Sequence, residues 1–327
     1  MKIVVTDANL SSWRGDLEAA LPGGTTVNWP DPADDAAIQQ SLLDADVLVG
    51  PRCTTDMGNA GKKLQLVQVA GAGTDKIEVN ALPPGTQVAN TFHHEDSIAE
   101  YVVATTVLLR RGILRQDAAL RRGEWASPAH NPAEPWVSGL AGATIGFVGF
   151  GHIGARTWEL FKAFRARGVT VTGRGNVDAA ANGLDWSGTV ADIGQLLEIS
   201  DVVVISAPLT PKTTGLIGAA ELAHMRSSAL LVNVGRGPLV DQQALYTALR
   251  NGSIAGAAID VWYDYPSSGN TGAPSALPFH ELTNLLMTPH SSGLTRQTFD
   301  GRTADVAANI NRLVAGQPLH NVVAVAR

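Results

Sequence analysis

Residues 144–154 read TIGFVGFGHIG, and this stretch decides the fold of the chain around it. An apolar run ends in glycines spaced G-x-G-x-x-G, and a helical pattern, HIGARTWELFKAF, follows at once. Glycines between a strand and a helix allow a tight turn, close approach of a pyrophosphate, and packing of the helix on the strand. The alternative is a tight strand–helix turn that binds no ligand. We predict a dinucleotide site whose contacts in this turn are Gly149, Gly151, His152, Ile153 and Gly154.

Short apolar runs alternate with helical patterns on both sides of this turn. The runs before it are KIVVT, TTVNW, DVLVG, LQLVQVA and TQVAN, and those after it are VTVTG, DVVVISAP, ALLVNVG, AGAAIDVW and NLLMTP. This alternation predicts mainly parallel sheets covered by helices. We also expect one long helix from about Ser97 to Arg122, and an amphipathic helix, TRQTFDGRTADVAANINRLVAG, that returns to the first unit.

Length, charge and cysteine content exclude several classes of protein. With 327 residues the chain is too long for one comfortable core, so two domains are expected. A net charge of −6 argues against a nucleic-acid partner, and the longest apolar stretches are too short and too interrupted to span a membrane. One cysteine, Cys53, excludes a disulfide framework within the chain, and MKIVVTDA enters a strand without a signal-peptide pattern. We expect a cytoplasmic protein, and we predict no metal site.

The end of the second strand after the glycine turn bears on the choice of cofactor. An NAD site usually has an Asp or Glu there, which binds the adenosine ribose. In this sequence the strand VTVT is followed by Gly-Arg-Gly-Asn, with no carboxylate before Asp178. Arg174 would bind a 2′-phosphate with charge-assisted hydrogen bonds, and the missing acid removes the repulsion that excludes such a group. The sequence therefore favours NADP(H), with NAD(H) as the alternative. Arg174 could instead stack on adenine with either cofactor, or be solvated.

Motifs along residues 70–315 resemble one family in order and spacing. They are GFVGFGHIG, APLTPKTTGLI, VNVGRGPLVDQQAL, GSIAGAAIDVW and LLMTPHSSGLT, and they resemble those of the D-isomer-specific 2-hydroxyacid dehydrogenases. The resemblance implies two α/β domains with Rossmann-like or flavodoxin-like parallel sheets and an active-site cleft between them. Residues 1–97 and 291–327 would form the substrate domain, and residues 98–290 the dinucleotide-binding domain. It also implies a homodimer, formed through cofactor-domain elements and the helix near residues 97–122. The segment TGRGN resembles the NADP-preferring glyoxylate and hydroxypyruvate reductases.

Two residues of these motifs suit the chemistry of a 2-keto acid. Hydride transfer to such an acid needs a cation for the carboxylate and carbonyl oxygen, and a proton donor for the developing alkoxide. Arg236, in NVGRG, offers a planar fork for bidentate carboxylate recognition, and the resemblance implies that His290, in TPHSSG, is the acid–base residue. The implied substrate contacts are Ala72, Gly73, Arg236 and His290. Further implied cofactor contacts are Pro208, Thr213, Val234, Gly235, Arg236, His290, Gly293 and Asp260, the last as the acid that holds the nicotinamide carboxamide.

One position departs from the family pattern. Most members carry a glutamate five residues beyond this aspartate, where it bonds the histidine and favours its charged form, but here the position is Tyr265. Three readings follow: Tyr265 orients His290 without charge, which we favour; Asp264 replaces the glutamate after a loop shift; or catalysis is impaired and the protein mainly binds its ligand. We predict a nicotinamide-dependent reductase of small 2-keto acids in which Arg236, His290 and Tyr265 are catalytic. The alternatives are a dehydrogenase of another small anion, such as formate, and a nicotinamide-sensing binding protein.

Overall fold

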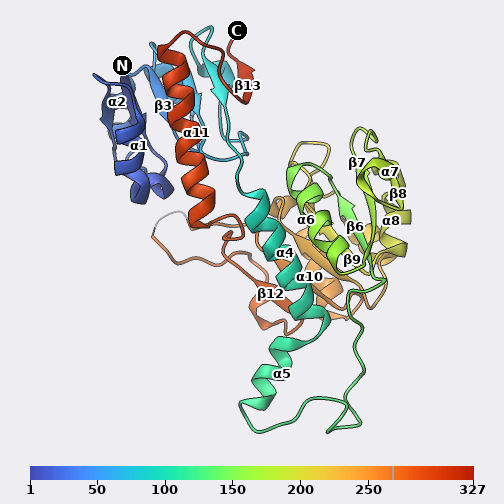
Figure 1. Ribbon diagram of the computed structural model, residues 1–327. Helices are drawn as coiled ribbons and strands as arrows, with labels where there is room; N and C mark the ends of the chain where they lie inside the picture. Colours follow the sequence, from blue (N-terminus) through green and yellow to red (C-terminus); the bar gives the residue numbers. More distant parts are fainter. Residues whose placement is uncertain (267–268) are drawn as a thin grey trace. The chain divides into compact units, whose positions relative to one another are not determined.

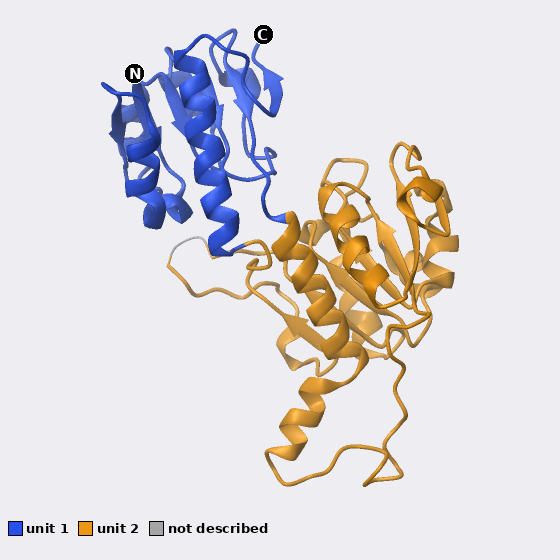
Figure 2. Ribbon diagram, viewed as in Figure 1, with its two compact units in different colours: residues 1–94, 294–327 blue, residues 95–293 orange. Residues whose placement is uncertain are grey.

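The computed structural model describes residues 1–266 and 269–327, which form two compact units (Figure 2). One unit consists of residues 1–94 and 294–327, and the other of residues 95–293. The boundaries expected from the sequence, after residues 97 and 290, differ slightly from these divisions.

The first unit is built on a six-stranded sheet in the order β13-β5-β4-β3-β1-β2. Leu66 and Val67 are neighbours in one strand, yet they belong to two different apolar clusters because successive side chains point to opposite faces. Burial on both faces explains why the strands read as continuous apolar runs. The strands are β1 (Lys2–Val5), β2 (Thr26–Asn28), β3 (Val47–Val49), β4 (Leu66–Gln68), β5 (Gln87–Ala89) and β13 (Val322–Val325), and the α-helices are α1 (Arg14–Ala20), α2 (Asp35–Leu42), α3 (Thr55–Ala60) and α11 (Arg296–Val314).

The second unit is built on a seven-stranded parallel sheet in the order β12-β11-β10-β9-β6-β7-β8. Val203 and Ile205 of one central strand pack into one apolar cluster, and the alternate residues Val202 and Val204 pack into the other. The strands are β6 (Thr144–Val148), β7 (Arg167–Thr172), β8 (Trp186–Thr189), β9 (Val202–Ile205), β10 (Leu230–Asn233), β11 (Gly256–Ile259) and β12 (Leu285–Met287). The α-helices are α4 (Glu95–Arg110), α5 (Ile113–Leu120), α6 (His152–Ala163), α7 (Ala179–Asn182), α8 (Ile193–Ile199), α9 (Ala219–His224) and α10 (Gln242–Arg250). The two sheets confirm the predicted fold class of two Rossmann-like α/β domains.

The single long helix expected near residues 97–122 is wrong. The chain forms α4 and then α5, with a break at Gly112, whose backbone has a φ of +61°. Glycine adopts this left-handed conformation without the steric penalty that a side chain would bring, and it commonly ends helices for that reason. After the break, α5 and the segment that follows it extend away from the sheet of this unit (Figure 1).

Two edge strands were not predicted from the sequence. The strand β8 reads Trp-Ser-Gly-Thr and has little of the apolar character that marks a buried strand. The strand β13 pairs with β5 in the antiparallel sense, with an irregular register between Val322 and Ala324, and three of its four residues are exposed. Edge strands bury only part of their side chains, so their sequences carry a weaker signal.

Candidate active site

The predicted site residues of the second unit follow one another along a single edge of its sheet. In the order β12-β11-β10-β9-β6-β7, each strand is parallel to its neighbours, so all six carboxyl ends lie on the same side. The strand order reverses direction between β9 and β6, which is where ligands bind in open sheets of this kind. The loops leaving these ends carry, in the same order, His290 and Gly293; Asp260 and Tyr265; Val234, Gly235 and Arg236; Pro208 and Thr213; the glycine turn; and Arg174.

The glycine turn joins β6 to α6, and each of its glycines is needed for a different reason. Gly149 has a φ of +94°, and a Cβ there would lie 2.7 Å from the Ala207 nitrogen. A Cβ on Gly154 would lie 2.8 Å from the Gly149 carbonyl oxygen, so this glycine lets helix and strand pack. A Cβ on Gly151 would meet no heavy atom within 4 Å in the described part of the chain, so packing does not explain this glycine. Its absent side chain is what close approach of a pyrophosphate requires.

The start of α6 fits the same group. Gly151 is the N-cap, and within residues 1–266 and 269–327 no side chain caps this helix and no acid stands in its first turn. The first N–H groups of a helix carry a partial positive charge and bind phosphate oxygens. His152 is the first helical residue, and Ile153 packs against the core below. The turn can therefore hold the pyrophosphate of a nicotinamide dinucleotide.

Arg174 lies in the exposed turn that follows β7. The described residues offer its guanidinium neither an ion pair nor a hydrogen bond. The next carboxylate along the chain, Asp178, caps α7 by accepting a hydrogen bond from the Ala181 N–H at 3.0 Å. The turn thus presents a cation where NAD-binding turns present an acid.

The hydroxyl of Thr213 holds the loop after β9 together by hydrogen bonds. Thr213 Oγ1 donates to the Pro208 carbonyl oxygen at 2.8 Å and accepts from the Thr210 N–H at 2.8 Å. Thr213 therefore fixes the position of Pro208 beside the glycine turn, and both predicted residues lie in one compact loop.

Arg236 lies in the loop after β10, between two glycines whose positions are packed too closely for a side chain. A Cβ on Gly235 would lie 2.7 Å from Leu239, and a Cβ on Gly237 would lie 2.3 Å from the Trp262 carbonyl oxygen. The Asn233 side chain donates to the Arg236 carbonyl oxygen at 3.0 Å, which fixes the backbone of the arginine. The Val234 side chain is buried in the core, so any ligand contact it makes is through its backbone.

His290 and Tyr265 form a hydrogen-bonded pair. Tyr265 Oη lies 3.0 Å from His290 Nδ1, and the Trp262 N–H donates to the same phenol oxygen at 3.2 Å. Burial raises the pKa of Tyr265 above its usual value, against the opposing effects of the Trp262 N–H and the charge of Arg236, so the phenol is neutral at pH 7. Among the described residues the exposed Asp264 carboxylate has no hydrogen-bond or ion-pair partner.

The His290 backbone is held in a strained conformation by Asp260. His290 has a φ of +57°, a left-handed conformation that costs a residue with a side chain about 1–2 kcal/mol. Asp260 is completely buried, and its two oxygens accept four hydrogen bonds from the loop around His290. The donors are the hydroxyl of Thr288 (2.6 Å), the N–H of Ser291 (2.9 Å), and the N–H (3.0 Å) and hydroxyl (2.5 Å) of Ser292. The predicted nicotinamide contact of Asp260 stays a prediction, and the contact observed is with this loop.

Two residues of this site were missed in the sequence. Trp262 belongs to the motif DVW, but its two N–H groups act separately: the backbone donates to Tyr265, and the indole donates to the Thr288 carbonyl oxygen at 2.8 Å. Thr288 bonds Asp260 from the position two residues before His290. No motif reveals a threonine hydroxyl of this kind, because its partner lies on a neighbouring strand.

In the first unit, Ala72 and Gly73 lie in the loop after β4. The Asn90 side chain donates to the Ala72 carbonyl oxygen at 2.8 Å, and the Thr91 N–H donates to the Gly71 carbonyl oxygen at 3.1 Å. These two hydrogen bonds tie the loop to residues 90–91, and the predicted substrate contacts of Ala72 and Gly73 stay predictions. Arg52 forms an ion pair with Asp35, and His93 Nε2 lies 2.8 Å from Asp305 Oδ2.

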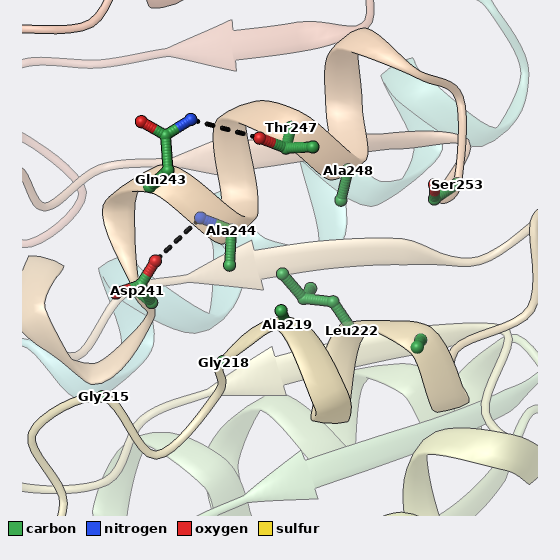
Figure 3. Close-up of a pocket in the computed structure, with 11 residues that line it drawn as sticks. Gly215, Gly218, Ala219, Leu222, Asp241, Gln243, Ala244, Thr247, Ala248 and Ser253 are labelled. Carbon is green, nitrogen blue, oxygen red and sulfur yellow. Dashed lines mark hydrogen bonds between the residues drawn. The ribbon is translucent and has the colours of Figure 1, made fainter.

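A hollow of about 580 Å³ lies between α9 and α10 (Figure 3). Small apolar side chains dominate its walls, and Asp241 is engaged in capping α10 through the Ala244 N–H at 2.7 Å. Elsewhere in residues 1–266 and 269–327, no group of three or more His, Cys, Asp or Glu side chains is placed to hold a metal ion. Nor does any helix of this described part have the length and apolar character needed to cross a membrane.

Comparisons with known proteins agree with this geometry. Residues 103–292 match the family model of the D-isomer-specific 2-hydroxyacid dehydrogenase, NAD binding domain. The chain is 33% identical over 293 residues to D-3-phosphoglycerate dehydrogenase of Methanocaldococcus jannaschii, covering 87% of this chain and 52% of that protein, so it spans about half the length of this relative. It is 34% identical over 264 residues to glycerate dehydrogenase of Methylorubrum extorquens, covering 80% and 79%. An acyclic imino acid reductase solved with NADPH and D-Arg superposes with a TM-score of 0.83 at 25% identity, covering 99% of this chain and 100% of that one.

Proposed function

Because the chain belongs to the D-isomer-specific 2-hydroxyacid dehydrogenase family, we propose that it is a nicotinamide-dependent oxidoreductase of small 2-keto acids and D-2-hydroxy acids. The observation that carries this proposal is the row of strand ends. It brings a cation, Arg236, and a histidine, His290, to the same sheet edge as the glycine turn. Glyoxylate and hydroxypyruvate are the substrates we favour.

The residues divide the work as follows. A bound nicotinamide cofactor supplies the hydride in reduction and accepts it in oxidation. Arg236 binds the substrate carboxylate and polarises the carbonyl, since its guanidinium can donate two parallel hydrogen bonds. His290 gives a proton to the developing alkoxide in reduction and takes it back in oxidation. The proposal includes Ala72 and Gly73 as backbone contacts of the substrate, on the family resemblance alone.

Tyr265 positions His290 without holding it charged. Reduction needs the imidazolium, whose Nδ1–H donates to Tyr265 Oη while the proton on Nε2 is transferred. Oxidation needs the neutral ring with its proton on Nδ1, which again donates to the phenol. A carboxylate can only accept a hydrogen bond, so it would favour the proton on Nδ1 that both of these forms carry. A phenol can also donate to an unprotonated Nδ1, so it favours these forms less. The active forms therefore gain less from Tyr265 than from the glutamate usual in the family.

We propose NADP(H) as the preferred cofactor. Arg174 supports this, because it is an exposed cation in the turn where a 2′-phosphate would lie and Asp178 is occupied as a helix cap. The test compares KM for NADPH and NADH in the wild type and in Arg174→Gln. The substitution should raise KM for NADPH about 10–100-fold and leave KM for NADH unchanged, since a charge-assisted bond contributes about 1.5–3 kcal/mol. A wild type that prefers NADH would contradict the assignment.

A second candidate reaction is the reduction of a 2-imino acid, and the neutral phenol of Tyr265, which does not hold His290 charged, favours it. A protonated imine carries its own proton and positive charge, so its reduction needs no proton from His290 and is disfavoured beside a second cation. The likeness to an acyclic imino acid reductase supports this candidate. Ammonium added to a keto acid distinguishes the two reactions, because an imine reductase forms an amine and a keto acid reductase forms an alcohol.

A homodimer and a cytoplasmic location complete the proposal. The segment of α5 and residues 121–139 extends from the second unit and exposes large apolar side chains, among them Trp136 (85% exposed) and Trp125 (60% exposed). Exposed apolar surface of this kind marks protein interfaces. Light scattering should give a dimer for the wild type and a smaller mass for Trp136→Ser. A wild-type monomer would contradict this part.

The activity itself is tested with purified protein and a panel of keto acids, with and without ammonium. We expect oxidation of NADPH that depends on the acid and is lost in His290→Gln, with the cofactor still bound. Turnover retained in His290→Gln without ammonium would remove this residue from the mechanism.

A further inference from the structure

A hydroxyl on α4 reaches the loop that carries His290. Tyr101 Oη lies 2.8 Å from Thr288 Oγ1, and the Thr288 hydroxyl donates to Asp260 Oδ1 at 2.6 Å. A carboxylate can only accept, so the single hydroxyl proton of Thr288 is committed to Asp260. Tyr101 must therefore be the donor to Thr288, and the chain of hydrogen bonds has one direction.

Asp260, the last acceptor in this series of hydrogen bonds, fixes the backbone around His290. Asp260 also accepts hydrogen bonds from Ser291 and Ser292, which directly follow His290. The carboxylate therefore binds residues on both sides of His290, whose backbone is left-handed. The Trp262 indole holds the Thr288 carbonyl oxygen from another direction. With the carbonyl fixed by tryptophan, the Thr288 side chain is the part whose orientation depends on Tyr101.

We propose that Tyr101 is a positioning residue for His290, acting through Thr288 and Asp260. This inference rests on the proposed acid–base role of His290. Tyr101 occupies one lone pair of the Thr288 oxygen and so orients the threonine proton toward Asp260 Oδ1. Burial raises the pKa of Tyr101 to about 12, so it remains a donor at every pH at which the protein would work.

The test removes single hydroxyls and leaves the rings and shapes in place. Tyr101→Phe deletes the first donor, and Thr288→Val deletes the second, whereas Thr288→Ser keeps the hydroxyl and serves as the rescue. Tyr263→Phe is the matched control, because it loses a tyrosine hydrogen bond in the same unit, to the Val240 carbonyl oxygen at 3.1 Å, and touches neither Thr288 nor Asp260. Each variant is measured for kcat, for KM of both substrates, and by NMR of the His290 imidazole.

We expect Tyr101→Phe to lower kcat about fivefold with KM for the cofactor unchanged, and Thr288→Val to lower it further. Thr288→Ser and Tyr263→Phe should stay within about twofold of the wild type. The His290 imidazole signals should move in Tyr101→Phe and not in Tyr263→Phe, and this readout does not need turnover. A wild type without activity but with this shift would sink the proposed function and support the positioning. Unmoved signals in Tyr101→Phe would overturn the positioning, as would a kcat equal to that of the control.

Discussion

Replacing Tyr265 tests whether a neutral phenol has taken the place of a charged partner of His290. The Tyr265 side chain is 51% exposed and its oxygen lies 3.0 Å from Nδ1, so the hydrogen bond should contribute about 1 kcal/mol. Tyr265→Phe should then lower kcat about fivefold, since about 1.4 kcal/mol corresponds to tenfold. Tyr265→Glu adds a carboxylate within reach of the imidazole and should favour its cation by about one pH unit.

The assay is the pH dependence of kcat for keto acid reduction. Reduction needs the protonated imidazole, so the rate falls as pH rises, and Tyr265→Glu should move this alkaline limb to higher pH. Because burial raises the pKa of Tyr265 above its usual value, titration of the phenol does not cause this limb. Asp264→Asn, at the exposed neighbouring position, should leave the profile unchanged. The reasoning is refuted by superimposable profiles of wild type and Tyr265→Glu, or by a shift in Asp264→Asn, which would give the role to Asp264.

Three further predictions follow from single contacts. Gly151→Ala should keep the thermal stability and raise the Kd of the cofactor about tenfold. Gly149→Ala should also lower the free energy of unfolding by at least about 2 kcal/mol, because its Cβ would clash with Ala207 and its backbone has a positive φ. Equal stability of the two variants would contradict this. Arg236→Lys should lower kcat/KM for the keto acid about 10–100-fold and leave cofactor binding intact, since lysine cannot form the bidentate contact; unchanged kcat/KM would remove the contact. The pKa of Tyr101 is about 12 in the folded state and about 10 in the unfolded state, so the unfolded state loses the phenol proton first. The free energy of unfolding should therefore fall by about 2–3 kcal/mol between pH 10 and pH 12. Denaturant titrations should show a smaller fall in Tyr101→Phe.

The parts of the fold that could be predicted are those buried on both sides of a sheet. Runs such as DVVVISAP and ALLVNVG form β9 and β10 because a buried parallel strand is apolar at nearly every position. The helix break at Gly112 was missed because the apolar spacing continues across it, and one glycine decides the break through its backbone. The edge strand β8 was missed because its sequence is polar and rich in small residues.

The candidate site could be predicted where a motif joins a strand to a turn. The glycines and Arg236 have fixed places directly after β6 and β10, so the sequence motif alone locates them. The counting that placed Tyr265 opposite His290 agrees with the hydrogen bond between them. The four bonds to Asp260 could not be foreseen, because they join neighbouring strands whose register no local pattern reveals.

The most direct test of the proposed function is the oxidation of NADPH by the purified protein in the presence of glyoxylate or hydroxypyruvate, followed by chiral analysis of the product formed from hydroxypyruvate. The proposal predicts acid-dependent loss of the reduced nicotinamide absorbance and a D-2-hydroxy acid as the product. Binding of NADPH without its oxidation by any keto acid, with or without ammonium, would contradict it.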